Sequence, residues 1–163
     1  MRYLNIERNE KTYLEIDLFG TAKSFRTAIE ETIRKDKIYY YNLRFFPQGC
    51  CTYVSDLLQR YLVEKFEFYT WLMSGEFEKE NDFESHAWLE TPDHNTVIDI
   101  SGDQYRNNKY LSFDQPVYVG TRIDGFHDKF VLREPIAFTK ANDPLWIDRK
   151  KESQYQAIVK RIR

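Results

Sequence analysis

The feature that most constrains the fold is a helical apolar pattern that begins directly after the tripeptide Pro47-Gln48-Gly49. Apolar side chains recur there at spacings of three and four, the period of one buried face of an α-helix. This face consists of Cys51, Val54, Leu57, Leu58, Tyr61 and Leu62. Because proline and glycine interrupt regular structure, the pattern predicts a helix whose first turn carries Cys51.

Two short strands are predicted after this helix. Residues 86–89 (His-Ala-Trp-Leu) and 96–100 (Thr-Val-Ile-Asp-Ile) are rich in aromatic and β-branched side chains, and residues 91–95 between them favour a turn. The pattern is typical of an antiparallel hairpin. It would carry His86 on one strand and Asp99 on the next.

Weaker patterns predict elements on the N-terminal side. Partial alternation at residues 13–18 predicts a short strand, and Thr21 is the expected N-cap of a helix. The apolar face of that helix consists of Ala22, Phe25, Ala28, Ile29 and Ile33. Aromatic residues at 66–73 predict a strand that turns at Ser74-Gly75, and residues 76–80 read as a charged loop.

The C-terminal third has a looser pattern. Residues 116–119 predict a strand, and Tyr155, Ile158, Val159 and Ile162 predict an amphipathic helix. Its last turn would hold Lys160, Arg161 and Arg163, where positive charge suits the helix dipole. Helices before and after a central run of strands indicate the α+β class.

Composition limits the classes of protein that fit. A chain of 163 residues is long enough for one domain with a sizeable core, so we expect a single domain over residues 1–163. The net charge of −2 gives no electrostatic reason to expect nucleic acid or a membrane surface as partner. No apolar run approaches the roughly 20 residues of a membrane helix, and two adjacent cysteines do not suggest a disulfide framework. The expected location is the reducing cytoplasm.

Cys51, His86 and Asp99 are the types of residue that nucleophilic catalysis requires. A thiol attacks as thiolate, and both a helix N-terminus and a nearby imidazolium lower its pKa. Adjacent strands bring directly opposed side chains to about 5 Å between Cβ atoms, which would let Asp99 fix the tautomer of His86. The backbone amide of a first-turn cysteine also suits a developing oxyanion.

The order of these motifs resembles a known group of enzymes. The stretch Phe46-Pro47-Gln48-Gly49-Cys50-Cys51, then His86-Ala87-Trp88-Leu89-Glu90 and Ile98-Asp99, is similar to the papain-like cysteine proteases in their transglutaminase-like permutation. The run from Ile98 to Tyr105 is similar to small bacterial proteins and to leader peptidases of lasso-peptide pathways. The resemblance covers residues 46–105 and implies a papain-like fold with the helix packed on an antiparallel sheet.

The resemblance also bears on which cysteine would react. The family's cysteine lies two positions after the glycine, which selects Cys51, although Cys50 stays open as the alternative nucleophile. The family often continues with Gly-Asp, whereas this chain has Thr52-Tyr53. That departure affects the shape of the helix start and the approach of a substrate.

Three further positions are candidates for the pocket. Gln48 is a candidate second oxyanion donor, Trp88 a candidate wall of the cleft, and Gln104 or Asp103 a candidate hydrogen-bond partner near the three catalytic candidates. Each also has a plainer interpretation: an exposed loop side chain, a core aromatic, and part of a turn or short helix. A metal site from His86, His94, Asp99 and a cysteine has no close ligand pair, so no metal and no cofactor are expected.

The sequence therefore predicts a cysteine hydrolase that acts on amide bonds, peptide or isopeptide, through a thioester, with transfer of the acyl group to an amine as a variant. The expected partner is a peptide or protein substrate. The alternative is a non-catalytic binding or regulatory module, such as a toxin, defence or immunity component, that keeps the fold without turnover. His127 has no partner that the sequence identifies.

Overall fold

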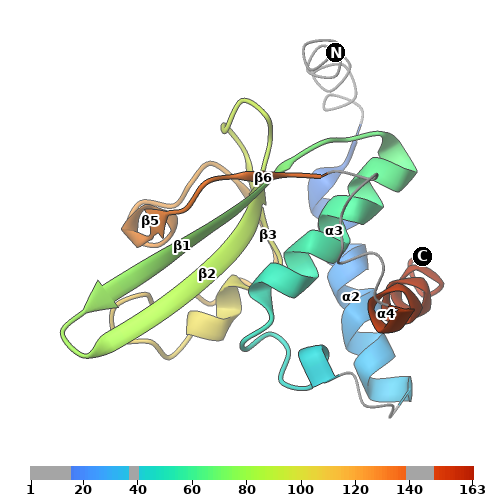
Figure 1. Ribbon diagram of the computed structural model, residues 1–163, viewed down its shortest axis with the longest axis horizontal. Coiled ribbons are helices and arrows are strands. Elements are labelled where there is room, and N and C mark those ends of the chain that lie inside the picture. The colour runs from blue at the N-terminus through green and yellow to red at the C-terminus, as the bar shows by residue number, and fades with distance from the viewer. Residues whose placement is uncertain (1–15, 37–40, 139–148) are drawn as a thin grey trace.

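The computed structural model describes residues 16–36, 41–138 and 149–163, and these form an α+β arrangement (Figure 1). The α-helices in this part of the chain are α2 (Leu18–Asp36), α3 (Cys51–Phe66) and α4 (Arg149–Val159). The strands are β1 (Trp71–Lys79), β2 (Asp82–Glu90), β3 (Val97–Asp99), β4 (Tyr118–Gly120), β5 (Val131–Leu132) and β6 (Ile136–Ala137). Short 3₁₀ helices are η1 (Tyr41–Leu43), η2 (Gly102–Tyr105) and η3 (His127–Lys129). The α+β prediction is confirmed.

The strands form one antiparallel sheet in the order β4-β3-β2-β1-β5, with β6 also paired to β1. The long β1–β2 hairpin is its centre, with Gly75 opposite His86. β3 pairs with β2 only at the Leu89–Ile98 and Glu90–Val97 positions, so no strand among the described residues pairs with the first part of β2 on that edge. The start of α3 lies beside this open edge, as the bond from Ser55 Oγ to the Ala87 carbonyl at 3.3 Å shows.

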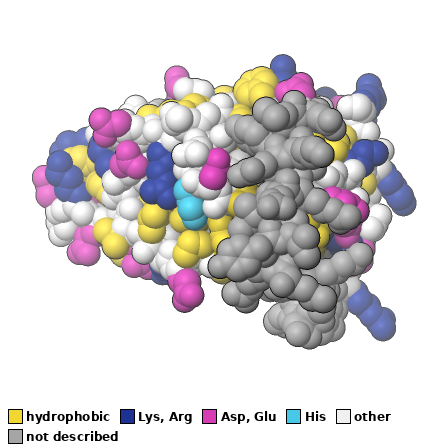
Figure 2. Space-filling view, turned by 90° about the horizontal axis from the view of Figure 1, so that it is seen from above, with side chains coloured by type: hydrophobic (Ala, Val, Ile, Leu, Met, Phe, Trp, Pro, Cys, Tyr) yellow, Lys and Arg dark blue, Asp and Glu magenta, His cyan; other side chains and the backbone are white. Residues whose placement is uncertain are grey.

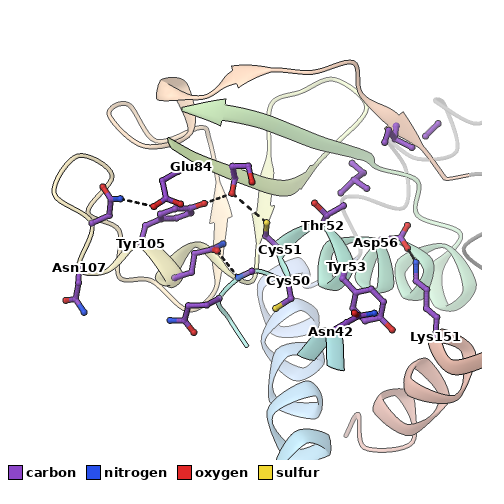
Figure 3. A pocket seen from close by; sticks show the side chains of 18 residues that line it. Asn42, Cys50, Cys51, Thr52, Tyr53, Asp56, Glu84, Tyr105, Asn107 and Lys151 are labelled. Atoms are coloured by element: carbon purple, nitrogen blue, oxygen red, sulfur yellow. Dashed lines mark hydrogen bonds and ion pairs between the residues drawn. The ribbon is translucent and has the colours of Figure 1, made fainter. Parts of the chain in front are cut away.

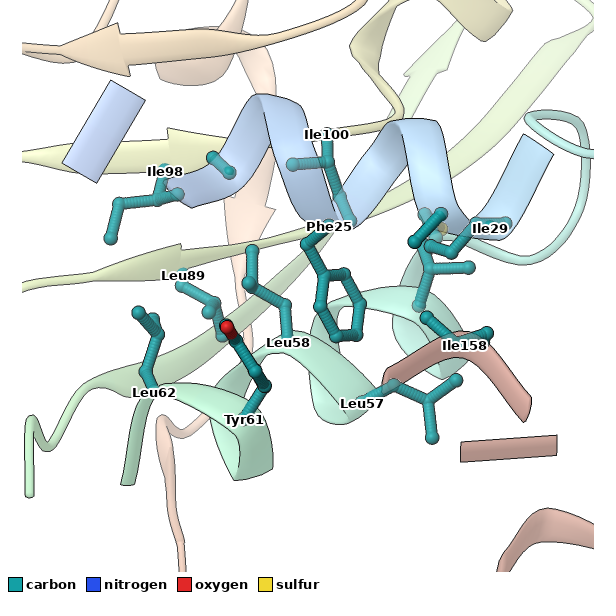
Figure 4. Close-up of a cluster of buried hydrophobic side chains, with 14 of the residues drawn as sticks. Phe25, Ile29, Leu57, Leu58, Tyr61, Leu62, Leu89, Ile98, Ile100 and Ile158 are labelled. Atoms are coloured by element: carbon teal, nitrogen blue, oxygen red, sulfur yellow. The ribbon is translucent and has the colours of Figure 1, made fainter. Parts of the chain in front are cut away.

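Two hydrophobic clusters occupy the two faces of the sheet. On one face, aliphatic side chains of α2, α3 and α4 pack on Ala87, Leu89, Ile98 and Ile100 (Figure 4). On the other face, a mostly aromatic cluster packs on Met73, Trp88 and Val97. Its remaining members are Phe77, Tyr105, Leu111, Phe113, Phe126 and Phe130. The strand alternation explains this division, because neighbouring residues of β2 point to opposite faces.

The predicted helix at Cys51 and the hairpin of His86 and Asp99 are confirmed. α3 begins at Cys51, after Gly49 with its positive φ of 68° turns the chain into the helix. The helix ends at Phe66, and the left-handed conformation of Glu67 after it lets the next amide, of Phe68, bond the Leu62 carbonyl at 3.2 Å.

Several predicted boundaries are wrong on the N-terminal side. α2 begins at Leu18 and not after Thr21, because the Asp17 carboxylate accepts the Gly20 amide at 2.8 Å and so caps the first turn. Of the strand predicted at 13–18, residues 13–15 lie outside the described residues and Leu18 is already helical.

The strand predicted at 66–73 is displaced, since only residues 71–73 of it are in β1, and the turn predicted at Ser74-Gly75 and the loop at 76–80 are wrong. α3 extends to Phe66, and β1 continues through Ser74-Gly75 to Lys79. Gly75 is inside the strand because β5 approaches it closely: a Cβ at this position would lie 2.8 Å from Phe130 Cβ. The charged residues that suggested a loop belong to the far end of the β1–β2 hairpin.

Near the C-terminus the predictions hold in part. β4 spans Tyr118–Gly120, so the predicted strand at 116–119 is displaced by one to two residues. α4 buries Tyr155 and Ile158 as predicted but ends at Val159, so Lys160, Arg161 and Arg163 follow the helix. Within the described ranges, no helix has both the length and the apolar character needed to cross a bilayer.

Candidate active site

Cys51 lies at the first position of α3, on the wall of a cavity of about 970 Å³ (Figure 3). Its side chain is 8% exposed, and its Sγ lies 4.0 Å from the Ser85 carbonyl oxygen on the open edge of β2. Burial alone would raise the pKa of this thiol. The contact with the His86 imidazole and the backbone groups of Ala87 and Thr52 outweigh burial, so the pKa lies below its ordinary value.

Cys50 differs from its neighbour in direction and surroundings. The two sulfur atoms point to different sides of the helix start in Figure 3, and Cys50 Sγ lies 3.5 Å from the Pro47 carbonyl oxygen. Burial, and then the proximity of Cys51, raise the pKa of Cys50 to about 12. Of the two thiols, only Cys51 is in surroundings that favour the thiolate.

His86 lies behind the thiol on β2 and is fully buried. Its Nε2 lies 2.7 Å from Asp99 Oδ2, and its Nδ1 lies 3.1 Å from Gln104 Nε2. Burial would lower the pKa of His86, but the Asp99 carboxylate and then Cys51 together raise it to about 9. The imidazole is therefore in contact with the thiol and with the acid.

His86 and Asp99 are diagonal rather than directly opposite. The register places Val97 opposite Glu90 and Ile98 opposite Leu89, so Asp99 follows toward Trp88, two residues from His86. Both side chains still point to the same face of the sheet. His86 lies four positions from Glu90 and Asp99 lies two positions from its partner Val97, and residues an even number of positions apart in a strand share a face. A diagonal pair of this kind is within the reach of an imidazole, and the 2.7 Å bond results.

Asp99 is fully buried and accepts bonds at both carboxylate oxygens. The Ser101 amide donates to Oδ1 at 3.0 Å, and His86 and His127 both lie within hydrogen-bond distance of Oδ2, at 2.7 and 3.2 Å. Burial would raise the pKa of Asp99, but the His86 charge and the bond from His127 hold it well below its ordinary value. Asp99 is therefore ionised at neutral pH.

Gln104 lies on η2 and links the cavity to His86. Its Nε2 donates to the Ser101 carbonyl and to His86 Nδ1, both at 3.1 Å, and its Oε1 lies 3.4 Å from the Gly49 amide. Gln104 thus bonds next to the candidate residues, and it does so from the short helix that its plainer interpretation predicts. In this orientation the amide favours an unprotonated Nδ1, because an Nδ1–H would face the amide N–H.

Gln48 and Trp88 occupy different positions. Gln48 is exposed and lines the cavity, with its backbone amide bonded to the Phe45 carbonyl at 2.7 Å. Trp88 is fully buried in the aromatic cluster, and its Nε1 donates to Glu90 Oε1 at 2.8 Å. Trp88 therefore packs beneath the site and is not a wall of the cleft.

The remaining candidates are structural. Asp103 forms a two-pronged ion pair with Arg26 of α2, at 2.7 and 2.9 Å, which ties η2 to the helices. His94 bonds Glu90 Oε2 at 2.7 Å at the β2–β3 turn, away from Asp99. Within the described residues, no three histidine, cysteine or acidic side chains form a cluster that would hold a metal ion.

The outer surface carries mixed charge. On the face in Figure 2, acidic and basic side chains are interspersed, and one histidine reaches the surface. Of the three histidines in the chain, only His94 has an exposed side chain; those of His86 and His127 are fully buried.

His127 is the residue that the sequence did not predict as part of the site. It shares Asp99 with His86, yet it lies in a stretch without helical or strand periodicity, and no motif marks it. Comparisons of this chain with family models, with the curated proteins and with the solved structures found no match.

Proposed function

We propose that the chain is a cysteine hydrolase of papain-like, transglutaminase-like fold that cleaves amide bonds of a peptide or protein. The observation that carries the proposal is the line of contacts from the Cys51 thiol to His86 and on to Asp99, with the thiol on a cavity wall. Each of the three comes from a different element, α3, β2 and β3, so the fold and not the local sequence assembles them.

The chemistry follows from these positions. The Cys51 thiolate attacks the carbonyl carbon, and the charge that develops on the oxygen is stabilised by the Cys51 backbone amide at the helix start. Gln48 is the candidate second donor, since it lines the same cavity. The carbon–nitrogen bond breaks as His86 gives its proton to the leaving amine. Water then attacks the thioester and frees the acid and the thiol; an amine in place of water would give acyl transfer.

Proton transfer to the leaving amine requires access to His86 Nδ1. In the structure the Gln104 amide lies on this nitrogen and also lines the cavity. Rotation of the Gln104 side chain would free Nδ1 of His86. The protonated Nδ1 would then form an ion pair with the Cys51 thiolate. His86 itself stays buried, which protects the imidazole from bulk water.

The cavity supports a chain segment as the substrate. Its volume of about 970 Å³ is near the upper end of typical ligand sites, about 300–1,000 Å³. Its lining includes the apolar side chains of Leu72 and Ile136 and the polar side chains of Glu84 and Asn108. A cavity that offers both apolar and polar contacts around a nucleophile suits a peptide segment.

The test is the rate of iodoacetamide alkylation of Cys51, measured by mass spectrometry between pH 5 and 9. We expect alkylation at pH 6 to be at least tenfold faster than for a small free thiol, since the thiolate forms at lower pH. Cys50 is the internal control and should react slowly. A Cys51 rate equal to that of the free thiol would refute the nucleophile and favour the binding module. Peptide cleavage that survives Cys51→Ala would likewise refute the mechanism in which Cys51 attacks the carbonyl carbon.

A further inference from the structure

His127 lies on η3, within hydrogen-bond distance of Asp99, and its side chain is fully buried. Four aromatic rings surround the imidazole at centroid distances of 4.8–5.8 Å: Trp88, Phe113, Tyr118 and Phe126. The titratable groups that face it from the packed elements are Asp99 of β3, His86 of β2 across the shared oxygen, and the Tyr118 phenol of β4. A polar ring in such surroundings needs a partner for each nitrogen.

Both ring nitrogens of His127 have a hydrogen-bond partner. The Ile123 backbone amide donates to Nδ1 at 3.2 Å, so Nδ1 carries no proton. The proton of the neutral ring is then on Nε2, which lies 3.2 Å from Asp99 Oδ2. His127 is therefore fixed by its surroundings as a neutral N–H donor to the carboxylate.

His86 donates to the same oxygen, at 2.7 Å. A hydrogen bond to an ionised carboxylate reduces the basicity of that carboxylate. The oxygen that binds the His86 proton thus shares its charge with a second donor.

We propose that His127 is a positioning residue of the proposed active site: by donating to the Asp99 oxygen that His86 also uses, it limits how strongly the carboxylate stabilises the protonated His86 ring. This inference rests on the proposed function for its purpose, because the protonated His86 ring must give up its Nδ1 proton to a leaving amine. If Asp99 lost the hydrogen bond from His127, its carboxylate would keep His86 protonated over a wider pH range.

Two substitutions separate the two contacts of His127. His127→Gln keeps an N–H donor near the Nε2 position and loses the acceptor for the Ile123 amide. His127→Asn keeps an acceptor near the Nδ1 position and loses the donor to Asp99. Both substitutions remove the ring, so the loss of packing is common to the two variants, and their difference reports which of the two contacts of His127, with Asp99 or with the Ile123 amide, controls His86.

The readout is the titration of His86 by nitrogen NMR in a Cys51→Ala background, which removes coupling to the thiol. We expect His127→Gln to match the parent, and His127→Asn to raise the pKa of His86 by roughly half a unit to one unit. A residue that only supports the fold would loosen Asp99 when it is lost, so the pKa of His86 would fall. A fall or an unchanged value in His127→Asn overturns the proposal.

Two further measurements keep the inference separate from the proposed function. The NMR spectrum of the unsubstituted chain at pH 7 should show the His127 proton on Nε2, and a proton on Nδ1 overturns the proposal even if neither variant folds. With Cys51 present, His127→Asn should lower the pH midpoint of alkylation by a similar amount. If the parent thiol is unreactive, the proposed function fails, whereas the His86 titration still decides the role of His127.

Discussion

On one face of the sheet the core is mostly aliphatic and lies under helices; on the other it is mostly aromatic and lies under irregular segments that follow β3. The aliphatic face combines α2 and α3 with α4 packed against α2. The aromatic face holds, among the described residues, the histidine and carboxylate side chains with 1% exposure or less. These are His86, Glu90, Asp99 and His127.

The difference follows from what each kind of side chain requires. Aliphatic burial depends on area and shape, and a helical stripe supplies both. A buried imidazole or carboxylate needs a partner for every polar atom, or it costs free energy. Irregular segments supply such partners at chosen positions, as the Ser101 amide does for Asp99 and the Ile123 amide for His127.

The proposed nucleophile belongs to the helical side and its base to the aromatic side. They meet at the open edge of β2, where β3 does not pair and the start of α3 lies. The comparison therefore suggests a division: the aliphatic face contributes stability, and the aromatic face sets the protonation of the site.

The strongest test of this division removes one side chain from each face. Asp99→Ala leaves three buried donors without an acceptor, so we expect a loss of about 3–5 kcal/mol in the free energy of unfolding. Thiolate formation at Cys51 should also move to higher pH, since the His86 charge loses its partner. Urea unfolding and alkylation with mass spectrometry measure the two effects.

Ile29→Ala is the matched variant on the aliphatic face. Ile29 is fully buried in α2, and its truncation should cost about 2–5 kcal/mol through lost burial and the cavity left behind. The alkylation profile of the folded protein should not change. If Ile29→Ala shifts that profile as far as Asp99→Ala does, the two faces do not act separately.

The pH dependence of stability should sharpen the same contrast, in a Cys51→Ala background where no thiol titrates. In this background the Asp99 carboxylate still raises the pKa of His86 above 6.5, so the stabilisation from His86 is full below about pH 6.5 and is lost as the pH rises through the raised pKa. The pKa of Asp99 is lowered, so its stabilisation is present above about pH 4 and is lost in stronger acid.

We therefore expect maximal stability between about pH 4 and 6.5 and a loss of stability as the pH rises toward 9. Urea unfolding at pH 5.5, 7 and 9 measures it. Adding Ile29→Ala should lower the free energy of unfolding by the same amount at each pH, because this substitution changes no charge. A flat curve from pH 5.5 to 9 would show that His86 and Asp99 do not interact in this way.

The same contrast explains what the sequence could and could not predict. The apolar residues between Cys51 and Leu62 recur at spacings of three and four. This pattern can be seen in consecutive residues, and the helix lies where the pattern predicts it. The hairpin with His86 and Asp99 is also local, although its register, and so the diagonal geometry, depends on pairing along the whole sheet.

The errors arise where long-range contacts decide. Ser74-Gly75 suggested a turn because glycine and serine favour turns, yet Gly75 is in a strand so that Phe130, far along the chain, can approach. No local sequence pattern marks His127, because its position is defined by hydrogen bonds with both Asp99 and the Ile123 amide. Gln104 was found only because it follows Asp99 closely in the sequence.

The smallest expected effect concerns Gln104, which lies where the aromatic face meets the cavity. Its amide donates to His86 Nδ1 and so favours the neutral imidazole. Gln104→Ala removes that donor, and we expect the pH midpoint of Cys51 alkylation to fall by about half a unit. Asn107→Ala, which removes another amide on the cavity wall, is the control and should leave the midpoint unchanged. A rise in the Gln104→Ala midpoint would mean that Gln104 holds His86 in place for the ion pair, and the aromatic face would then set protonation through alignment rather than through competing donors.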